Sequence, residues 1–399
     1  MEDPVEQAER ALTDVPLCDR CLGRLFAMLG RGLSNDERGK ALKLAVVLRL
    51  HSRIREGDRE ALDKFREIAP NVGPLASRLY EELFGSKLEP RSCVICGGSL
   101  DSFVDEAAAR AYESLAAYNV RSFLIGVRVP QEYVAREEEL KSRHSLKYSE
   151  SLKSELKRQI GKLVQARYGL RPDFTRPDAI ATVEFPTGRV EVSVRRLGIA
   201  VSYFRFNRWL PIRPYKLHPL VKAIIDRVGG ASVAVHGLVR DELGVRVLGA
   251  GLPLVIEVSR PRSRDVLRPG DTIEVEGAAF KVKAIDAKPP SQDELARRVR
   301  TYRCVITSEA SISTATLSLA SSSIIGKQVR QRVGSHEAVG QVRGISCVPI
   351  TDRAAECLVS VDEKIYIREL ITGEGTTPSL SEALATKLEC LSADLVGVS

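Results

Sequence analysis

Two neighbouring carboxylates flanked by arginines are the residues of this chain whose types and spacing most favour chemistry. Asp241 and Glu242 lie in the stretch HGLVRDELGVRVLG, with Arg240 before them and Arg246 after them. A carboxylate acts as a nucleophile or a base only when it is ionised and held, and a preceding arginine can do both. The alternative is a polar turn between two strands. We therefore take Glu242 and Asp241 as candidate catalytic residues, with Arg240 orienting the carboxylate.

Two C-x-x-C pairs, CDRC and CVIC, form a second candidate site. In a cytosolic chain such pairs favour a tetrahedral zinc site over disulfides, because a two-residue spacer lets one turn direct two thiolates at one ion. Lost metal or a redox pair is the alternative. The predicted ligands of a structural zinc ion are Cys18, Cys21, Cys93 and Cys96. The remaining cysteines, Cys304, Cys347, Cys357 and Cys390, are isolated in apolar surroundings.

Composition limits the class of protein. The 399 residues suffice for two or three domains, and 44% hydrophobic with 28% charged residues is ordinary for a soluble globular protein. No apolar run approaches about 18 residues, and the acidic opening MEDPVEQAER is unlike a signal peptide, so we expect a cytoplasmic protein without a membrane span. The net charge of +8 is mild support for a nucleic-acid partner, although it also suits a slightly basic soluble protein. The sequence contains no P-loop, GxGxxG, HExxH or GxSxG motif, and we expect no organic cofactor.

The elements that must position these residues fall into three expected domains. Residues 1–105 are predicted to form a helical segment bracketed by the cysteine pairs, with a helix that begins at Ser34 or Asn35. In residues 106–215 we expect a strand at Phe123–Val129 and an amphipathic helix that ends at Gly169. The outer face of that helix is basic and is either solvated or follows an RNA backbone; it carries Lys153, Lys157, Arg158 and Lys162.

The end of the middle domain mixes basic and aromatic residues. The stretches RPDFTRPDAIATVEF, RVEVSVRRLGIAVSYFRF and NRWLPIRPY are predicted to be short strands with a loop. Their aromatic residues either fill a core or stack on RNA bases while arginines pair with phosphates. These residues are Tyr203, Phe204, Arg205, Arg208, Trp209 and Arg213.

Residues 216–399 are predicted to be an α+β domain around a mixed, mostly antiparallel sheet, because strands and helices alternate without a regular βαβ rhythm. The expected strands are SVAVHGLV, VRVLG, LPLVIEV, DTIEVEGAAFKVKAI, TYRCVIT, ECLVSV and IYIREL. The expected helices are SQDELARRVR and SLSEALATKLE.

Several motifs together resemble those of the archaeal and eukaryotic tRNA pseudouridine synthases that modify the T-arm, the pseudouridine-54/55 synthase family. The N-terminal motifs are CDRCLGRLFAMLGRGLSNDERGKALK and CVICGG, and ESLKSELKRQIGKLV and RPDFTRPDAIATVEF are similar to the family's RNA-binding domain of THUMP type. In the C-terminal domain, VRVLGAGLPLVIEVSRPRSR, RTYRCVI, KIYIRELITGEGTTPS and CLSADLVGV resemble its catalytic-domain segments. The resemblance covers nearly the whole chain.

The resemblance implies an isomerase that detaches uracil from its sugar, rotates it and rejoins it through carbon. It implies tRNA as the partner, structural zinc, no redox cofactor and no membrane; no obligatory protein partner is expected. A flipped base needs an aromatic-lined pocket, and Tyr302 and Tyr366 occupy the family's tyrosine positions. Packing between strands is the alternative role for both tyrosines.

The chain departs from the family at the catalytic turn. Where the family has Gly-Arg-Glu-Asp, this sequence has Val239, Arg240, Asp241 and Glu242, so a glutamate stands at the position of the catalytic aspartate. Two hypotheses follow. The first is an active synthase that uses Glu242, or Asp241, with Arg240. The second is a catalytically weak or inactive homologue that binds tRNA as a chaperone or accessory factor.

Overall fold

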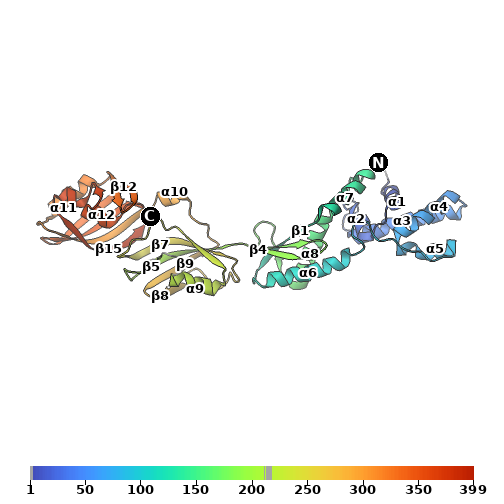
Figure 1. The fold of residues 1–399 in the computed structure, drawn as a ribbon, viewed down its shortest axis with the longest axis horizontal. Helices are drawn as coiled ribbons and strands as arrows, with labels where there is room; N and C mark the ends of the chain where they lie inside the picture. Colours follow the sequence, from blue (N-terminus) through green and yellow to red (C-terminus); the bar gives the residue numbers. More distant parts are fainter. Residues whose placement is uncertain (1–2, 211, 213–217) are drawn as a thin grey trace. The chain divides into compact units, whose positions relative to one another are not determined.

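The computed structural model describes residues 3–210, 212 and 218–399. The chain divides into two compact units, Met1–Ser193 and Val194–Ser399, each with its own sheet (Figure 1). The three-domain bounds 1–105, 106–215 and 216–399 stay a prediction. Strand β5 (Leu197–Arg205) pairs with strands of the second unit.

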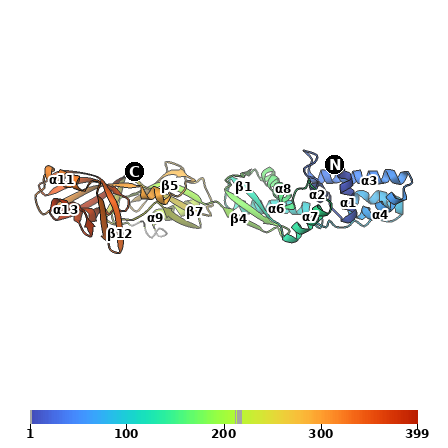
Figure 2. The same cartoon turned by 90° about the horizontal axis from the view of Figure 1, so that it is seen from above.

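The first unit begins with packed helices, as predicted, and α3 and α4 run side by side (Figure 2). The α3 helix begins after Ser34, whose side chain forms a capping box with Glu37, as the sequence indicated. Helix α2 crosses α3 so closely that a Cβ on Gly39 would lie 1.8 Å from the carbonyl oxygen of Asp19. The helices are α1 (Pro4–Asp14), α2 (Asp19–Arg24), α3 (Asn35–Arg55), α4 (Arg59–Val72), the 3₁₀ turn η1 (Pro74–Ala76) and α5 (Ser77–Phe84).

The rest of this unit is a four-stranded sheet, in the order β2-β1-β3-β4, packed against α6 and α8. The predicted amphipathic helix is confirmed as α8 (Leu152–Tyr168), with Ser151 as its N-cap and Gly169 in the left-handed conformation at its end. The predicted strand is β1 (Ser122–Arg128). The other elements are α6 (Leu100–Ala116), α7 (Gln131–Arg143), β2 (Arg171–Pro172), β3 (Ala179–Glu184) and β4 (Val190–Val194).

The second unit is built on a mostly antiparallel sheet, in the order β14-β11-β12-β13-β10-β15-β7-β5-β9-β8, with β6 also paired to β7. The α+β class is therefore confirmed. Strand β7 (Val245–Ser259) joins the two halves of the sheet, because its first residues pair in parallel with β15 and it pairs antiparallel with β5. The two predicted strands VRVLG and LPLVIEV are parts of this single strand.

The remaining elements of the second unit cover or extend this sheet; α9 lies beside β8 and β9 in Figure 1. The strands are β6 (Ser232–His236), β8 (Thr272–Val275), β9 (Ala278–Ile285), β10 (Val299–Ser308), β11 (Gln328–Val333), β12 (His336–Thr351), β13 (Ala354–Asp362), β14 (Thr376–Thr377) and β15 (Leu388–Val398). The helices are α9 (Pro219–Val228), α10 (Gln292–Ala296), α11 (Thr314–Ile324), α12 (Ile367–Thr372) and α13 (Leu380–Leu384).

Two local predictions were wrong. IYIREL is not a strand: Tyr366 is the N-cap of helix α12, which buries Ile367 and Leu370 with helical spacing. The predicted helix SLSEALATKLE stops after α13, because Ala385 adopts a left-handed conformation and β15 begins at Leu388. The loop predicted among the stretches RPDFTRPDAIATVEF, RVEVSVRRLGIAVSYFRF and NRWLPIRPY includes the turn Asn207–Leu210. Within the described residues, no helix combines the length and apolar character needed to cross a bilayer.

Candidate functional site

The candidate catalytic turn, residues 237–244, connects β6 to β7 in the second unit. Gly237 and Gly244 stand at its two ends with φ angles of 95° and 74°, which glycine adopts without strain. The amide of Gly244 donates to the carbonyl of Arg208 at 2.9 Å, and the Arg208 guanidinium donates back to the carbonyl of Gly244 at 3.0 Å. These bonds fix the backbone that carries the two carboxylates.

Glu242 has a carboxylate that is only 7% exposed, and three donors converge on its Oε1 atom. Tyr302 donates its hydroxyl at 2.6 Å, and the guanidinium of Arg240 lies at 2.9 Å. Arg300 lies at 3.4 Å. Among the described residues, no hydrogen-bond donor contacts the second oxygen, Oε2. One oxygen is thus held in place and the other is available.

Arg300 and Tyr302 come from the same face of β10, two residues apart. The Arg300 guanidinium also pairs with Glu363 at 2.5 and 2.9 Å, so it bridges two buried carboxylates. Burial opposes the charge of Arg300, but Tyr302, Glu363 and Glu242 outweigh it and raise the pKa of that guanidinium. Burial, and then the Glu242 charge, raises the pKa of Tyr302 to about 12.

Asp241 has a separate set of partners. Its carboxylate accepts from Arg205 at 2.6 Å and from the amide of Ile212 at 2.8 Å. Arg205 is itself buried and also donates to the carbonyl of Val245 at 2.7 Å. The contacts of Asp241 therefore tie the turn to β5 and the segment after it, whereas those of Glu242 reach across the sheet to β10.

Tyr366 joins the same cluster from the start of α12. The guanidinium of Arg240 lies 4.6 Å above the centre of the Tyr366 ring, within the range of a cation–π contact. Two buried nitrogens of Arg240, Nε and Nη1, have no hydrogen-bond partner in the described part of the chain. The cavity beside Glu242 is about 10 Å³, roughly the room for one water molecule.

The structure thus brings four predicted site residues together: Glu242, Arg240, Tyr302 and Tyr366. The fifth, Asp241, lies next to them in the chain but faces other partners. Sequence reasoning missed Arg300 as part of the cluster. Arg300 stands one residue before the predicted strand TYRCVIT and two before Tyr302; a strand longer by that residue would put both side chains on one face, and that spacing was an available signal. No comparable signal in the sequence marked Glu363, because its pairing with Arg300 depends on the register of β10 and β13.

The four cysteines of the C-x-x-C pairs converge, with their sulfur atoms all within 4.8 Å of one another. The Sγ atoms of Cys18 and Cys96 are 3.6 Å apart. Four thiolates around zinc lie about 3.8 Å from one another when each bond is about 2.3 Å. Cys18 caps α2, and Gly97 and Gly98 supply positive φ angles after the second pair. The cluster can therefore hold a metal ion.

Two of the isolated cysteines form a disulfide, Cys347–Cys357. They are directly opposite each other on β12 and β13, so the hairpin register brings them together. Sequence spacing alone did not predict this pairing.

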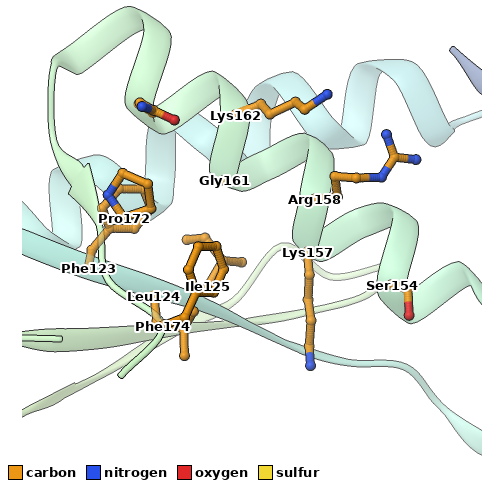
Figure 3. Close-up of a pocket in the computed structure, with 11 residues that line it drawn as sticks. Phe123, Leu124, Ile125, Ser154, Lys157, Arg158, Gly161, Lys162, Pro172 and Phe174 are labelled. Atoms are coloured by element: carbon orange, nitrogen blue, oxygen red, sulfur yellow. The ribbon is translucent and has the colours of Figure 1, made fainter. Parts of the chain in front are cut away.

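The largely apolar pocket in the first unit has a volume of about 620 Å³ and lies between β1, α8 and the segment after β2. Figure 3 shows Lys157, Arg158 and Lys162 on the helix, with Pro172 and Phe174 across the pocket from it. Phe174 is 83% exposed. The basic face predicted for α8 therefore borders an apolar hollow with an exposed aromatic ring.

The mixed basic and aromatic stretch at residues 203–213 divides between core and surface. Tyr203 is buried, and Arg205 binds the candidate catalytic turn. Trp209 is 73% exposed. Arg213 lies outside the described residues.

Comparisons with known proteins agree over the whole chain. The family model "Pus10 THUMP domain, archaeal" matches residues 107–184, and "Pus10, C-terminal" matches residues 216–399. A protein of Acidilobus saccharovorans named tRNA pseudouridine synthase Pus10 is 45% identical over 100% of this chain and 98% of its own length. One of the same name from Aeropyrum pernix is 35% identical over 99% of this chain and 97% of its own.

Among solved structures, a chain of an H/ACA RNP bound to a substrate RNA is similar over 49% of this chain and 46% of that chain. The identity is 13% and the TM-score 0.31, too low to bear on function. The hypothesis of an inactive tRNA-binding homologue finds no support in these comparisons, since the curated relatives are named as enzymes. With family models matching both units and relatives matching nearly their full length, the chain belongs to the Pus10 family.

Proposed function

We propose that this protein is a tRNA pseudouridine synthase that isomerises uridine 54 or 55 in the T-arm, with Glu242 as the reacting carboxylate. The reaction breaks the bond between C1′ and N1 and forms one between C1′ and C5. The hydrogen on C5 leaves as a proton and N1 gains a proton, so no redox cofactor is required. Family membership and the names of the full-length relatives support the activity and the substrate.

The observation that carries the assignment to Glu242 is the convergence of Arg240, Tyr302 and Arg300 on one of its oxygens. Fixed donors hold a carboxylate in one orientation, and preorganised groups cost no rearrangement at the moment of reaction. The second oxygen is left to attack the sugar or to accept a proton. Asp241 keeps a structural role, because one of its oxygens binds Arg205 at the end of β5 and the other binds the amide of Ile212.

Tyr366 and Tyr302 have different roles in this proposal. Tyr302 is fully buried and orients Glu242, while Tyr366 is half-buried and offers a ring face beside Arg240. A cavity of about 10 Å³ does not admit a uracil ring, so the side chains around Glu242 move when the flipped base enters. The partnerless nitrogens of Arg240 supply donors for a carbonyl or phosphate oxygen of the substrate.

The first unit supplies further binding in this proposal. The pocket bordered by Lys157, Arg158 and Lys162 combines cations with the exposed Phe174 ring, a pairing that suits RNA phosphates and bases. The four-cysteine cluster holds structural zinc, which stabilises the helical segment and takes no part in the reaction. A tRNA-modifying enzyme of this kind acts in the cytoplasm.

The deciding experiment is site-resolved mapping of pseudouridine in tRNA transcripts incubated with the wild type, Glu242→Ala and Asp241→Asn. We expect modification at position 54 or 55 by the wild type, none by Glu242→Ala, and residual activity with Asp241→Asn. Binding of the same transcript is measured in parallel and should survive in Glu242→Ala. Loss of activity in Asp241→Asn with retention in Glu242→Ala would reverse the assignment. Binding by the wild type without any pseudouridine would refute the enzyme.

A further inference from the structure

We propose that Trp209 is a positioning residue that stacks on a nucleobase of the RNA next to the uridine being modified. The inference rests on the proposed function and adds a specific contact to it. Trp209 is the only tryptophan in the chain and is 73% exposed. A large apolar ring that is left in water contributes little to folding, and the ring's place beside Gly244 leaves its face open to a ligand.

The Trp209 ring lies against the catalytic turn. Its Cη2 atom is 3.8 Å from the position that a Cβ on Gly244 would occupy. Gly244 is two residues after Glu242 and donates its amide to the carbonyl of Arg208, the residue before Trp209. The tryptophan is therefore at the rim of the turn that carries the proposed reacting carboxylate.

The backbone around Trp209 is fixed even though its ring is exposed. The amide of Trp209 donates to Oδ1 of Asn207 at 3.0 Å. The guanidinium of Arg208 donates to the carbonyls of Gly244 and Ala393, at 3.0 and 2.6 Å. These bonds hold the loop on both the turn and β15, so the ring is presented from a rigid support.

The charges near Trp209 suit RNA. The guanidinium of Arg368 lies 3.0 Å from the same Cβ position on Gly244, and its buried Nε has no hydrogen-bond partner among the described residues. Arg208 and Arg246 both pair with Asp394, so two guanidinium groups share one carboxylate near this rim, and Arg368 adds a third cation. An aromatic face beside a surplus of cations is the combination that binds unpaired bases and their phosphates. An apolar protein partner would not need that surplus.

Stacking by Trp209 also fits the rearrangement of the RNA that the reaction requires. A uridine that leaves its stack exposes the neighbouring base, and an aromatic ring at the rim covers that base. Stacking tolerates any base, so this contact supports binding and orientation rather than sequence recognition. Removal of the ring is expected to weaken RNA binding about 10-fold, within the range of one base–aromatic contact.

The single tryptophan makes the test direct, because all tryptophan fluorescence of the protein comes from this ring. We expect a T-arm stem-loop RNA to quench that fluorescence in the wild type, with a midpoint equal to the Kd measured with labelled RNA. Trp209→Ala should raise Kd and KM about 10-fold with kcat within about 3-fold of the wild type, and Trp209→Phe should restore both. Leu319→Ala, at an equally exposed apolar residue on α11, is the matched control and should change neither.

Two results would overturn the inference. One is unchanged fluorescence at RNA concentrations that saturate binding. The other is a Trp209→Ala variant whose Kd matches the wild type, including a variant in which only kcat falls. Quenching with a raised Kd in Trp209→Ala, but no pseudouridine from the wild type, would support the stacking contact while refuting the proposed enzyme.

Discussion

At the scale of single residues, the order of the two carboxylates is reversed relative to the family pattern, and each now contacts different partners. The shorter Asp241 reaches Arg205 and a backbone amide nearby, while the longer Glu242 reaches Tyr302 on another strand. The extra methylene of one side chain is matched by a missing methylene in its neighbour. We propose that the reversal is compensated within the pair and that the site uses the glutamate.

Shortening Glu242 tests this compensation. Glu242→Asp should withdraw the carboxylate by about 1 Å from Tyr302, and misplacement on that scale can cost about 100-fold in rate. Single-turnover kinetics with saturating enzyme measure the effect on the chemical step. The double variant Asp241→Glu/Glu242→Asp restores the family order and should recover part of the rate. A double variant no faster than the single variant would contradict the compensation.

The buried hydroxyl of Tyr302 gives a prediction about pH. Burial, and then the charge of Glu242, raises the pKa of Tyr302 to about 12, so the hydroxyl stays protonated and donates well into the alkaline range. Tyr302→Phe should therefore lower the rate by a constant factor of about 10-fold between about pH 7 and pH 10. Rate profiles of both proteins check this. A wild-type rate that approaches the variant's near pH 10 would show that the hydroxyl had ionised.

The sequence predicted which residues gather at the site but not how they are bonded. Tyr302, Tyr366, Arg240 and Glu242 could be named because each stands in a recognisable motif. The bridging of Glu242 and Glu363 by Arg300 could not, because it depends on a register between strands about 60 residues apart. The different directions of Asp241 and Glu242 likewise depend on the turn geometry rather than on composition.

At the scale of elements, helices with clear end signals were predicted correctly, whereas a short apolar run was assigned the wrong structure. Helices α3 and α8 were predicted because a capping serine or a terminal glycine marks their ends. IYIREL was mistaken for a strand because a short apolar run fits both periods. Its helical form is set by tertiary contacts: Gln331 on β11 accepts from the Tyr366 amide at 2.7 Å and donates to its carbonyl at 2.8 Å.

An ion pair spans the parallel pairing of β7 with β15, and its contribution to stability changes with pH. Asp394 is opposite Arg246 in the register and binds it at 2.6 and 2.8 Å, with Arg208 at 2.7 Å. Burial opposes the charge of Asp394, but the two arginines outweigh it and lower the pKa of that carboxyl. A lowered pKa means stability that is present above the unfolded value of 3.8 and is lost as the pH falls through the folded value.

Asp394→Asn should therefore reduce the free energy of unfolding at pH 7 by about 1 kcal/mol, a modest value because both arginine partners are partly exposed to solvent. Denaturant unfolding at several pH values measures this difference. The gap between variant and wild type should close at a pH below the folded pKa of Asp394, where both side chains are neutral. Asp352→Asn, in the turn after β12, is a control at an exposed carboxylate. If the difference in free energy of unfolding persisted unchanged in acid, the destabilisation would come from lost packing and not from the ion pair.

At the scale of the whole molecule, the cysteine cluster and the catalytic turn belong to different compact units, each with its own sheet. The cluster joins the start of α2 to the segment before α6, residues that are 78 positions apart in the chain. A metal ion held by the cluster would therefore close a long loop within the first unit alone. Structural zinc contributes directly to folding free energy, so its removal should act on that unit and leave the other intact.

Removal of the metal should therefore destabilise the first unit and leave the stability of the second unit unchanged. With a strong chelator, or in Cys18→Ser/Cys96→Ser, we expect fast hydrogen exchange in α1 to α5, while β7, β10 and β15 keep their protection. Zinc released by the wild type should approach one ion per chain in a colorimetric assay, because four thiolates complete a single site. Cys390→Ser, at a cysteine of the second unit, is the matched control and should release as much zinc as the wild type.

Because the groups around Glu242 all lie in the second unit, the metal-free protein should still form pseudouridine in a T-arm fragment that needs no contact with the first unit. Loss of protection around β7 and β10 on chelation would show instead that the two units fold as one.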